Sequence, residues 1–470
     1  MAKYKAYPEY KDSGVEWLKS TPAHWSSAPI KYLALATNSL FLDGDWIESK
    51  DISDDGVRYI TTGNVGEGLY KEQGSGFITE NTFSKLNCTE VFEGDILISR
   101  LNNPIGRACL VPSLGYKTVT SVDNVIFRTD KYYNRKYLVY LFSSKDYFQH
   151  TGNLARGTTM QRISRGLLGN IRIPVPTRSE QASIAAFLDH ETAKIDNLIE
   201  KQQQLIELLK EKRQAVISHA VTKGLNPDVP MKDSGVEWLG EVPAHWTIPS
   251  LKYNISTRKG VAFKSSDFCD SGIRVVKASD IKKKTIISSD VFLPVCFSKE
   301  YPKAVLNFGD IVLSTVGSTP DVKNSAVGQL GYVPAELEGS LLNQNTVVFS
   351  SNSNMLEQFY LFLLLQTNIY RDHLDLHAHG TANQASLNVS DMLEFKYPCP
   401  SLSEQIEIVD YIQNCNSKFD DLETCSEEAI KYLQERRTAL ISAAVTGKID
   451  VRDWVAPALN DAEVPQEATA

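Results

Sequence analysis

The chain of 470 residues lacks long apolar segments and paired cysteines. Its longest apolar run, Phe359–Leu365, is far shorter than the ~20 residues that cross a bilayer, and no apolar stretch typical of a signal peptide follows Lys3 and Lys5. The seven cysteines include no C-x-x-C pair, which argues against a structural zinc site and a disulfide framework. We therefore expect a cytoplasmic protein with reduced cysteines and no membrane association.

A surplus of positive charge is also missing, because the formal net charge is −8 at pH 7. Nucleic-acid-binding domains often carry such a surplus, so the total charge gives no indication of this function. The local distribution does, since no acidic residue occurs between Asp146 and Glu180. The arginines of this stretch are Arg156, Arg162, Arg165, Arg172 and Arg178, interleaved with Thr158, Thr159 and Gln161. They predict a basic, hydrogen-bonding strip.

Catalytic signatures are absent as well. The sequence has no amino-methyltransferase signature and no glycine-rich turn placed between a strand and a helix for a nucleotide. Asp310, Asp321 and Lys323 imitate the paired acids and lysine of a nuclease metal site, but the first half of the chain has no Asp-x-Lys triplet and such triplets often arise by chance. A two-domain nuclease acting alone through these three residues is the alternative hypothesis. The main prediction is no catalytic residue, no metal site and no cofactor in this chain.

The most informative feature that is present is an internal repeat. The octapeptide KDSGVEWL occurs at Lys11–Leu18 and again at Lys232–Leu239, and each copy is followed by Pro-Ala-His-Trp. A second pair of matching segments, Val175–Gln181 and Cys399–Gln405, closes each repeat. Between these near-identical segments the two copies are almost unrelated. We infer that the repeated segments meet the same partner twice, whereas the divergent regions each meet something different.

The divergent regions predict two mixed, mainly β domains of an α+β protein. Residues 26–176 and 247–400 contain short β-branched or aromatic runs separated by Gly, Asn, Asp and Pro. The apolar segments Tyr137–Phe142 and Phe359–Leu365 predict one buried helix in each domain. The remaining segments are an N-terminal repeated segment (1–25), a central helix (177–224), a linker with the second SGVEWL copy (225–246), a C-terminal helix (401–449) and a tail expected to be disordered (450–470).

The two long helices carry heptad seams. Ser179 and Ser403 are the predicted N-caps, each followed by a glutamate in the first turn. Because a long helix with a narrow apolar seam is not stable alone in water, we expect the two helices to pair as an antiparallel coiled coil. The alternative is two separate helices, each packed on its own domain. The predicted coiled-coil residues are Ile195, Leu198, Leu205, Leu209, Val216, Phe419, Leu422, Leu433 and Leu440.

This order of features resembles the specificity subunit of type I restriction–modification systems. Two dissimilar domains are each preceded by SGVEWL and P-x-H-W and followed by S-E-Q and a helix ending in paired basic residues and Ala-Val-Thr. The resemblance covers residues 10–452. It implies a pseudo-twofold internal repeat, with two target recognition domains that read the two halves of a bipartite, asymmetric double-stranded DNA target. It also implies that the helices set the spacer and dock two methyltransferase subunits, to which restriction (motor) subunits add.

The resemblance places the cofactors in those partners, with S-adenosylmethionine in the methyltransferase subunits and ATP and magnesium in the motor subunits. Base reading requires donors and acceptors in the DNA grooves, and phosphate contacts require cations. The candidate DNA-binding residues are Arg156, Thr158, Thr159, Gln161, Arg162, Arg165, Lys264, Lys282, Lys283, Lys284, Asn383, Gln384 and Ser386. The repeated tryptophans Trp17, Trp25, Trp238 and Trp246 fit either a docking surface for a partner or the core of each repeat.

Overall fold

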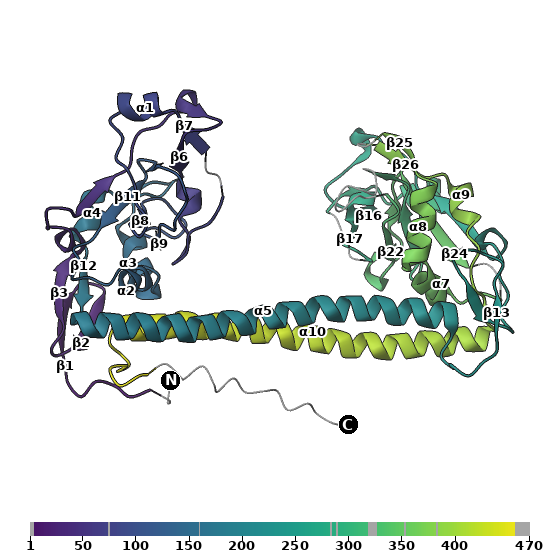
Figure 1. The fold of residues 1–470 in the computed structure, drawn as a ribbon. Coiled ribbons are helices and arrows are strands. Elements are labelled where there is room, and N and C mark those ends of the chain that lie inside the picture. The colour runs from purple at the N-terminus through teal and green to yellow at the C-terminus, as the bar shows by residue number, and fades with distance from the viewer. Residues whose placement is uncertain are drawn as a thin grey trace. The chain divides into compact units, whose positions relative to one another are not determined.

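The structure is a computed structural model in which residues 4–73, 76–158, 160–282, 284–287, 290–317, 327–351, 354–381 and 384–455 are described (Figure 1). It divides into two compact units. Unit 1 comprises Met1–Gln203 with Glu427–Ala470, and unit 2 comprises Gln204–Ser426. Among the described residues, no helix combines the length and the apolar character needed to span a membrane.

Unit 1 begins with strands formed by the repeated N-terminal segment. The hairpin β1 (Tyr10–Val15) and β2 (Leu18–Pro22) is followed by β3 (Ser26–Pro29), which pairs with β12 (Arg172–Val175) at the end of the first domain. The domain between them has two four-stranded sheets. In order across each sheet, the strands are β4 (Leu40–Asp43), β11 (Asn124–Arg128), β8 (Ile96–Ser99) and β9 (Ala108–Leu110), and then β10 (Thr118–Thr120), β6 (Val57–Ile60), β7 (Gly76–Ile78) and β5 (Ile52–Ser53). Its helices are α1 (Glu80–Lys85), α2 (Arg135–Leu141), α3 (Lys145–Leu154) and α4 (Arg165–Asn170).

Unit 2 contains the second domain after the hairpin β13 (Met231–Asp233) and β14 (Glu241–Pro243). Its largest sheet has the order β15 (Ile255–Lys259), β24 (Thr346–Ser351), β20 (Ile311–Ser314), β22 (Leu330–Tyr332), β18 (Thr285–Ile286) and β17 (Ile281–Lys282). Two three-stranded sheets follow, namely β19 (Phe292–Leu293), β16 (Ile273–Val276) and β23 (Leu341–Leu342), and β21 (Val316–Gly317), β26 (Gln384–Ser386) and β25 (His379–Thr381). The helices are α6 (Phe297–Glu300), α7 (Gln358–Leu365), α8 (Asn368–Leu376) and α9 (Val389–Leu393).

The two domains share one framework in spite of their dissimilar sequences. In unit 1, β11 lies between β4 and β8, all antiparallel, and in unit 2, β24 lies between β15 and β20 in the same way. The predicted buried helices are confirmed as α2 and α7. Each buries a tyrosine that makes the same hydrogen bond, because Tyr137 Oη donates to Pro174 O at 3.1 Å and Tyr360 Oη donates to Pro398 O at 3.0 Å. This equivalence allows positions in the two domains to be matched strand by strand.

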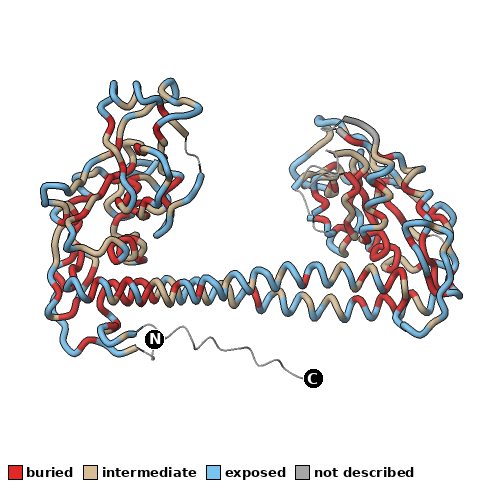
Figure 2. The backbone as a smooth tube through the Cα atoms, in the orientation of Figure 1, coloured by how far each residue is buried: buried red, intermediate tan, exposed pale blue. Residues whose placement is uncertain are grey.

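Burial follows the sheets and the helix faces that meet them (Figure 2). In unit 1, one continuous apolar cluster joins the sheet residues Ile98 and Phe127 to α2 and to Ile184 of the long helix. In unit 2, the corresponding cluster joins Leu313 and Phe349 to α7 and to Ile408 of the C-terminal long helix. Each domain is therefore packed onto the helix pair of its own unit through a shared core.

The two long helices are α5 (Arg178–Lys223) and α10 (Leu402–Val445). In each unit, part of α5 packs antiparallel against part of α10, which confirms the predicted helix pair. In unit 1, Ile195 and Leu440 are buried and Arg437 Nε lies 2.8 Å from Asp196 Oδ1. In unit 2, Leu209 is buried, and the Arg213 guanidinium lies 2.7 Å from the Asp420 carboxylate and 3.0 Å from that of Glu423.

The structure differs from the predicted seam at several positions. Leu198, Leu205 and Leu422 are exposed, and Val216, Phe419 and Leu433 are only half-buried. Two helices without a third neighbour bury a strip that is narrower than a full heptad face, and an unsupercoiled helix drifts away from strict heptad spacing. The seam is therefore deepest where a domain core covers it.

The helix starts and the C-terminal segment also differ from expectation. The N-caps are Thr177 and Ser401, whose hydroxyls accept from Glu180 N at 3.4 Å and Glu404 N at 3.3 Å. In unit 1 the arrangement is a capping box with Glu180 at N3, because Thr177 N also donates to Glu180 Oε2 at 3.2 Å. The expectation of disorder from residue 450 onward is wrong for 450–455. Val451 is buried in the core of unit 1, and the amide of Asp450 donates to Lys5 O at 2.8 Å. Residues 456–470 lie outside the described residues.

Candidate nucleic-acid interface

Arg156 and Arg162, the first two arginines of the basic strip, pair in a short hairpin next to β8, whereas Arg165, Arg172 and Arg178 begin α4, β12 and α5. The backbone amides of Arg156 and Arg162 each donate to the other's carbonyl at 2.9 Å, and Leu101 bridges Arg162 on its other side. Gly157 has φ +110°, and a Cβ there would lie 2.5 Å from Met160 O, so this turn requires glycine. Gly157 and Thr158 therefore lie at the tip of this hairpin.

The polar side chains of this hairpin face solvent. Arg156, Thr158 and Gln161 are exposed, whereas Thr159 lies outside the described residues. The second domain has the same arrangement in β21, β26 and β25, where Ser386 pairs with both Val316 and His379. Ser386 therefore occupies the register position of Arg162. For Gln384 only the backbone is described, and Asn383 lies outside the described residues.

Behind the hairpin, arginines and aspartates form a network in the first domain. Arg100 is only 5% exposed and its Nε lies 3.1 Å from Asp43 Oδ1. Asp123 Oδ1 lies 2.8 Å from Arg162 Nη2 and 3.7 Å from Arg100 Nη2. Arg165 Nε lies 3.8 Å from Asp43 Oδ2. Burial lowers the pKa of Arg100, and the neighbouring Asp43 opposes this effect.

The network leaves positive charge on the surface. Three guanidinium groups share the carboxylates of Asp43 and Asp123, and the exposed Arg156 adds a further cation. The carboxylates fix the positions of Arg162 and Arg165, whose side chains are nearly half exposed. Positioned, partly desolvated arginines are suited to bind phosphate oxygens or the acceptor edge of guanine, because a guanidinium donates two parallel hydrogen bonds.

The second domain has different residues at the same positions. Strand register aligns Lys259 with Asp43, since Lys259 pairs with Val347 of β24 and Asp43 with Val125 of β11. Thr315 follows β20 as Arg100 follows β8, and Asn345 precedes β24 as Asp123 precedes β11. Instead of an ion-pair network, these residues line a cavity of about 250 Å³ together with Thr346 and Asn388. One domain therefore presents fixed arginines, and the other an open polar cavity with a lysine.

The described lysines among those predicted in the second domain belong to different elements. Lys264 belongs to the 3-10 helix Ser265–Asp267, as its N-cap, at the place that Glu48 occupies in the first domain. Lys282 is exposed on β17. Lys284 is exposed, and its Nζ donates to Gln214 Oε1 of α5 at 3.0 Å, so this ammonium is directed to the helix. Lys283 lies outside the described residues.

Sequence reasoning missed Asp43, Arg100 and Lys259. A signal was available in Gly44 and Gly260, which follow Asp43 and Lys259 in the two copies. A Cβ at Gly44 would lie 2.4 Å from Ser121 O, and one at Gly260 would lie 1.8 Å from Asn343 O. Both turns therefore require glycine, and this shared requirement marks the preceding residue as an equivalent position in the two copies.

One of the two aspartates of the nuclease hypothesis, Asp310, has a structural partner. Asp310 is buried, forms an ion pair with Arg258, and accepts from Ser350 Oγ at 3.0 Å and from Asn307 N at 2.8 Å. The equivalent Asp95 is likewise buried, 2.6 Å from Arg128 Nη2. Asp321 and Lys323 lie outside the described residues. Among the described residues, no group of three or more His, Cys, Asp or Glu side chains has the geometry to hold a metal ion.

A repeated cluster anchors each long helix to the segment before its domain. In unit 1, Glu180 Oε1 lies 2.7 Å from His24 Nε2 and accepts from Trp25 Nε1 at 3.3 Å, while its Oε2 accepts from Thr177. In unit 2, Glu404 accepts from Trp246 Nε1 at 3.0 Å. Burial raises the pKa of Glu180, but the hydrogen bonds from His24, Thr177 and Trp25 outweigh burial and leave this pKa below its ordinary value.

These contacts decide the role of two of the repeated tryptophans. Trp25 and Trp246 are 1% and 0% exposed and belong to the cores of their units, so their side chains have no surface left for a partner. Trp17 is half-buried and donates to Arg172 O at 3.0 Å. Trp238 is exposed and stacks on Phe395 with ring centroids 4.9 Å apart. Of the four tryptophans, only Trp17 and Trp238 retain surface on which docking is possible.

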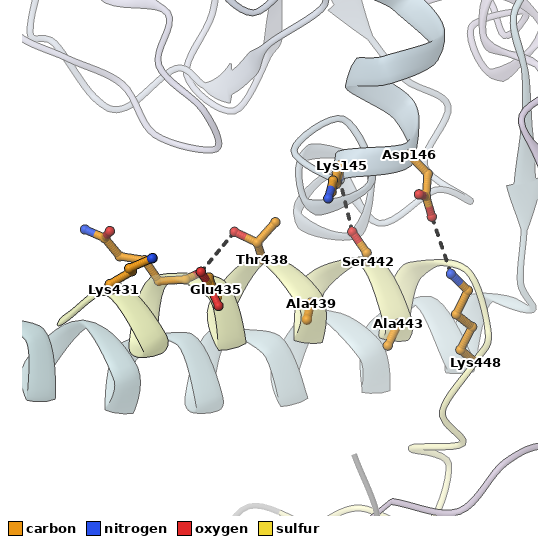
Figure 3. A pocket seen from close by; sticks show the side chains of 10 residues that line it. Lys145, Asp146, Lys431, Glu435, Thr438, Ala439, Ser442, Ala443 and Lys448 are labelled. Atoms are coloured by element: carbon orange, nitrogen blue, oxygen red, sulfur yellow. Dashed lines mark hydrogen bonds and ion pairs between the residues drawn. The ribbon is translucent and has the colours of Figure 1, made fainter. Parts of the chain in front are cut away.

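A cavity of about 780 Å³ lies between the start of α3 and the α10 segment of unit 1 (Figure 3). Lys145 N donates to Ser442 Oγ at 3.1 Å, and Lys448 Nζ donates to Asp146 Oδ2 at 3.4 Å across its edge. Its other lining residues include Lys431, Glu435 and Thr438. Mixed charges spread along a helix are typical of a contact surface and lack the converging groups of a catalytic site.

Comparison with known proteins gives one consistent family. The model of the type I restriction modification DNA specificity domain matches residues 40–208 and 253–432. The MjaVIII specificity subunit of Methanocaldococcus jannaschii is 26% identical over 394 residues, covering 82% of this chain and 88% of that protein. The EcoBI specificity subunit of Escherichia coli is 22% identical over 73% of this chain and 70% of its own length.

Two solved structures share the fold. A chain from a study of complex assembly in a type I R-M system has a TM-score of 0.67 and 16% identity, with 91% of this chain and 99% of that chain covered. The HsdS subunit from Thermoanaerobacter tengcongensis has a TM-score of 0.52 and 16% identity, with 91% and 98% covered.

Proposed function

Because this chain belongs to the type I restriction modification DNA specificity domain family, we propose that it is a specificity subunit, the non-catalytic DNA-reading component of a type I restriction–modification complex. Its first domain reads one half of a bipartite, asymmetric double-stranded DNA target, and its second domain reads the other. The methyl-transferring and DNA-cleaving chemistry then belongs to partner subunits, and the complex works in the cytoplasm, where it meets DNA.

One observation supports the division of labour most directly. At equivalent places on a shared framework, the first domain has Asp43, Arg100 and Arg162, whereas the second has Lys259, Thr315 and Ser386. Side chains that read bases must differ when the bases differ, but the framework that positions them can stay the same. Three pairs of equivalent positions with unlike donors and acceptors are suited to two unlike DNA words.

The partners follow from the resemblance and from the helices. We propose two methyltransferase subunits that dock on α5, α10 and the repeated segments, with restriction subunits added in the full complex. S-adenosylmethionine binds in the methyltransferase subunits, and ATP and magnesium bind in the restriction subunits. The helix pair sets the number of unread base pairs between the two words, because its length is fixed by continuous helical segments.

The proposal is tested by mapping methylated bases in cells that carry this chain with its methyltransferase partner, and in cells that lack only this chain. The expected result is methylation at one sequence made of two unlike words with a fixed spacer, lost when the chain is absent. Methylation that persists unchanged without the chain contradicts the proposal. DNA cleavage by the purified chain with magnesium alone contradicts its non-catalytic part.

A further inference from the structure

Phe187 of α5 and Tyr411 of α10 occupy the same place in the repeat, since each lies at the same distance along the chain from the repeated Ser-Glu-Gln. Their surroundings differ sharply. Phe187 is 0% exposed, whereas Tyr411 is 46% exposed. An aromatic ring that one copy buries completely is therefore left half in solvent by the other.

The cover over Phe187 comes from two segments of unit 1. The ring of Tyr4 meets it edge-on with centroids 5.4 Å apart, and the indole of Trp454 does the same at 5.6 Å. The ring centroids of Trp454 and His190 are also 5.6 Å apart, and Tyr4 Oη donates to Glu191 Oε2 at 3.1 Å. In unit 1, Phe187 is thus covered by aromatic side chains from two separate segments of the chain, one containing Tyr4 and the other Trp454.

Among the described residues of unit 2, no aromatic ring packs on Tyr411 as Tyr4 and Trp454 pack on Phe187. A single short connection replaces the two segments that cover Phe187 in unit 1. Residues 224–230 run directly from the end of α5 to β13 and contain no aromatic residue. The result is a groove of about 460 Å³, which we call the Tyr411 groove. It is lined by Lys212, Ala215, Val216, His219, Leu225 and Tyr411.

We propose that the Tyr411 groove docks a segment of a partner protein that carries a tryptophan or phenylalanine next to an acidic residue. The volume falls within the range of small binding sites. Exposed Lys212 and His219 at its edge favour a carboxylate in the occupant. The occupant of unit 1 has this chemistry, since Asp453 directly precedes Trp454. This surface lies on the helix pair, where the proposed function also docks the methyltransferase subunits, but the groove is argued from Tyr411 and its neighbours alone and stands without that assignment.

The probe for the test is a fluorescein-labelled synthetic peptide of residues 448–456, which reproduces the unit 1 occupant. Binding to the full chain is followed by fluorescence anisotropy. We expect saturable binding, weakened about tenfold or more by Tyr411→Ala, because a central aromatic contact dominates a small interface. A peptide with Trp454→Ala should fail to bind. The matched control is Tyr432→Ala, which removes an exposed tyrosine on the same helix and should leave the affinity unchanged.

A second variant tests the groove without removing Tyr411, in case Tyr411→Ala does not fold. Ala215→Trp fills the groove from an exposed helix position, and should block the peptide while circular dichroism shows unchanged helix content. The proposal is overturned if the peptide does not bind, or if it binds wild type, Tyr411→Ala and Ala215→Trp equally. It is also overturned if sedimentation shows self-association that Trp454→Ala abolishes, since the occupant is then a second copy of this chain.

Discussion

Arg100 and Arg162 both lie close to the carboxylate of Asp123, yet replacing them should affect different properties of the protein. Arg162→Ala should weaken DNA binding and leave the fold stable, whereas Arg100→Met should destabilise the fold. The difference arises from burial. The Arg162 side chain is 46% exposed and that of Arg100 only 6%. An exposed guanidinium is available to DNA, and a buried one is available only to the protein.

The structure sets the expected magnitudes. Breaking a buried ion pair costs about 3–5 kcal/mol, but Asp43 and Asp123 are partly exposed and keep Arg165 and Arg162 as second cations. We therefore expect Arg100→Met to lower the free energy of unfolding by about 2–3 kcal/mol. The half-exposed pair of Arg162 with Asp123 contributes about 1 kcal/mol or less. Loss of one guanidinium contact to a base edge should weaken binding by about 1–3 kcal/mol.

Two assays on the same variants separate these effects. Urea unfolding gives the stability of each variant, and fluorescence anisotropy with target DNA at several salt concentrations gives the affinity of the complex with its methyltransferase partner. If Arg162 contacts a phosphate instead of a base, the slope of log K against log salt should fall by about 0.9. The reasoning is refuted if Arg162→Ala binds DNA with unchanged affinity and salt slope, or if Arg100→Met is as stable as wild type.

Further predictions concern the turn, the helix anchor and the second domain. Gly44→Ala should destabilise the protein by about 1–3 kcal/mol through overpacking, measured by urea unfolding, whereas Gly152→Ala, with no atom within 4 Å of the new Cβ, should not. Glu180→Ala should lower the free energy of unfolding by about 2 kcal/mol through loss of the cap and the Trp25 hydrogen bond. Because the folded pKa of Glu180 lies below its ordinary value of 4.5, the carboxylate's contribution is complete above that value and is lost as pH falls through the folded pKa. Glu180→Gln should therefore flatten the fall in stability between neutral and acidic pH, and an unchanged pH profile contradicts the anchor. Lys259→Ala should alter or weaken methylation only in the half of the target read by the second domain, and a change in both halves argues against separate reading.

The elements that follow from local pattern were predictable from the sequence. The repeated segments, the helices α2 and α7 and the paired long helices all carry short-range signals, namely identical anchors, apolar runs and heptads. The N-caps were misplaced by two residues because Ser179 and Thr177 are both good caps. Only the position of Glu180, which must reach back to Thr177, distinguishes them.

The site was less predictable because strand register brings its parts together. Asp43, Arg100 and Asp123 lie far apart in the sequence and meet only when β4, β11 and β8 pair. The arginine strip was visible as composition, but composition does not show that Asp43 and Asp123 fix two of its members. Burial of Trp25 was equally hidden, since a repeated aromatic residue fits a docking surface and a core equally well until its neighbours are known.

The central claim is that each domain reads its own half of the target. The most direct measurement replaces residues 247–400 by a second copy of residues 26–176 and maps the methylated sites of cells that carry this chimera with its methyltransferase partner. The account predicts a symmetric target in which the word of the first domain appears twice, in inverted orientation, with the original word of the second domain gone. Retention of the original asymmetric target contradicts it.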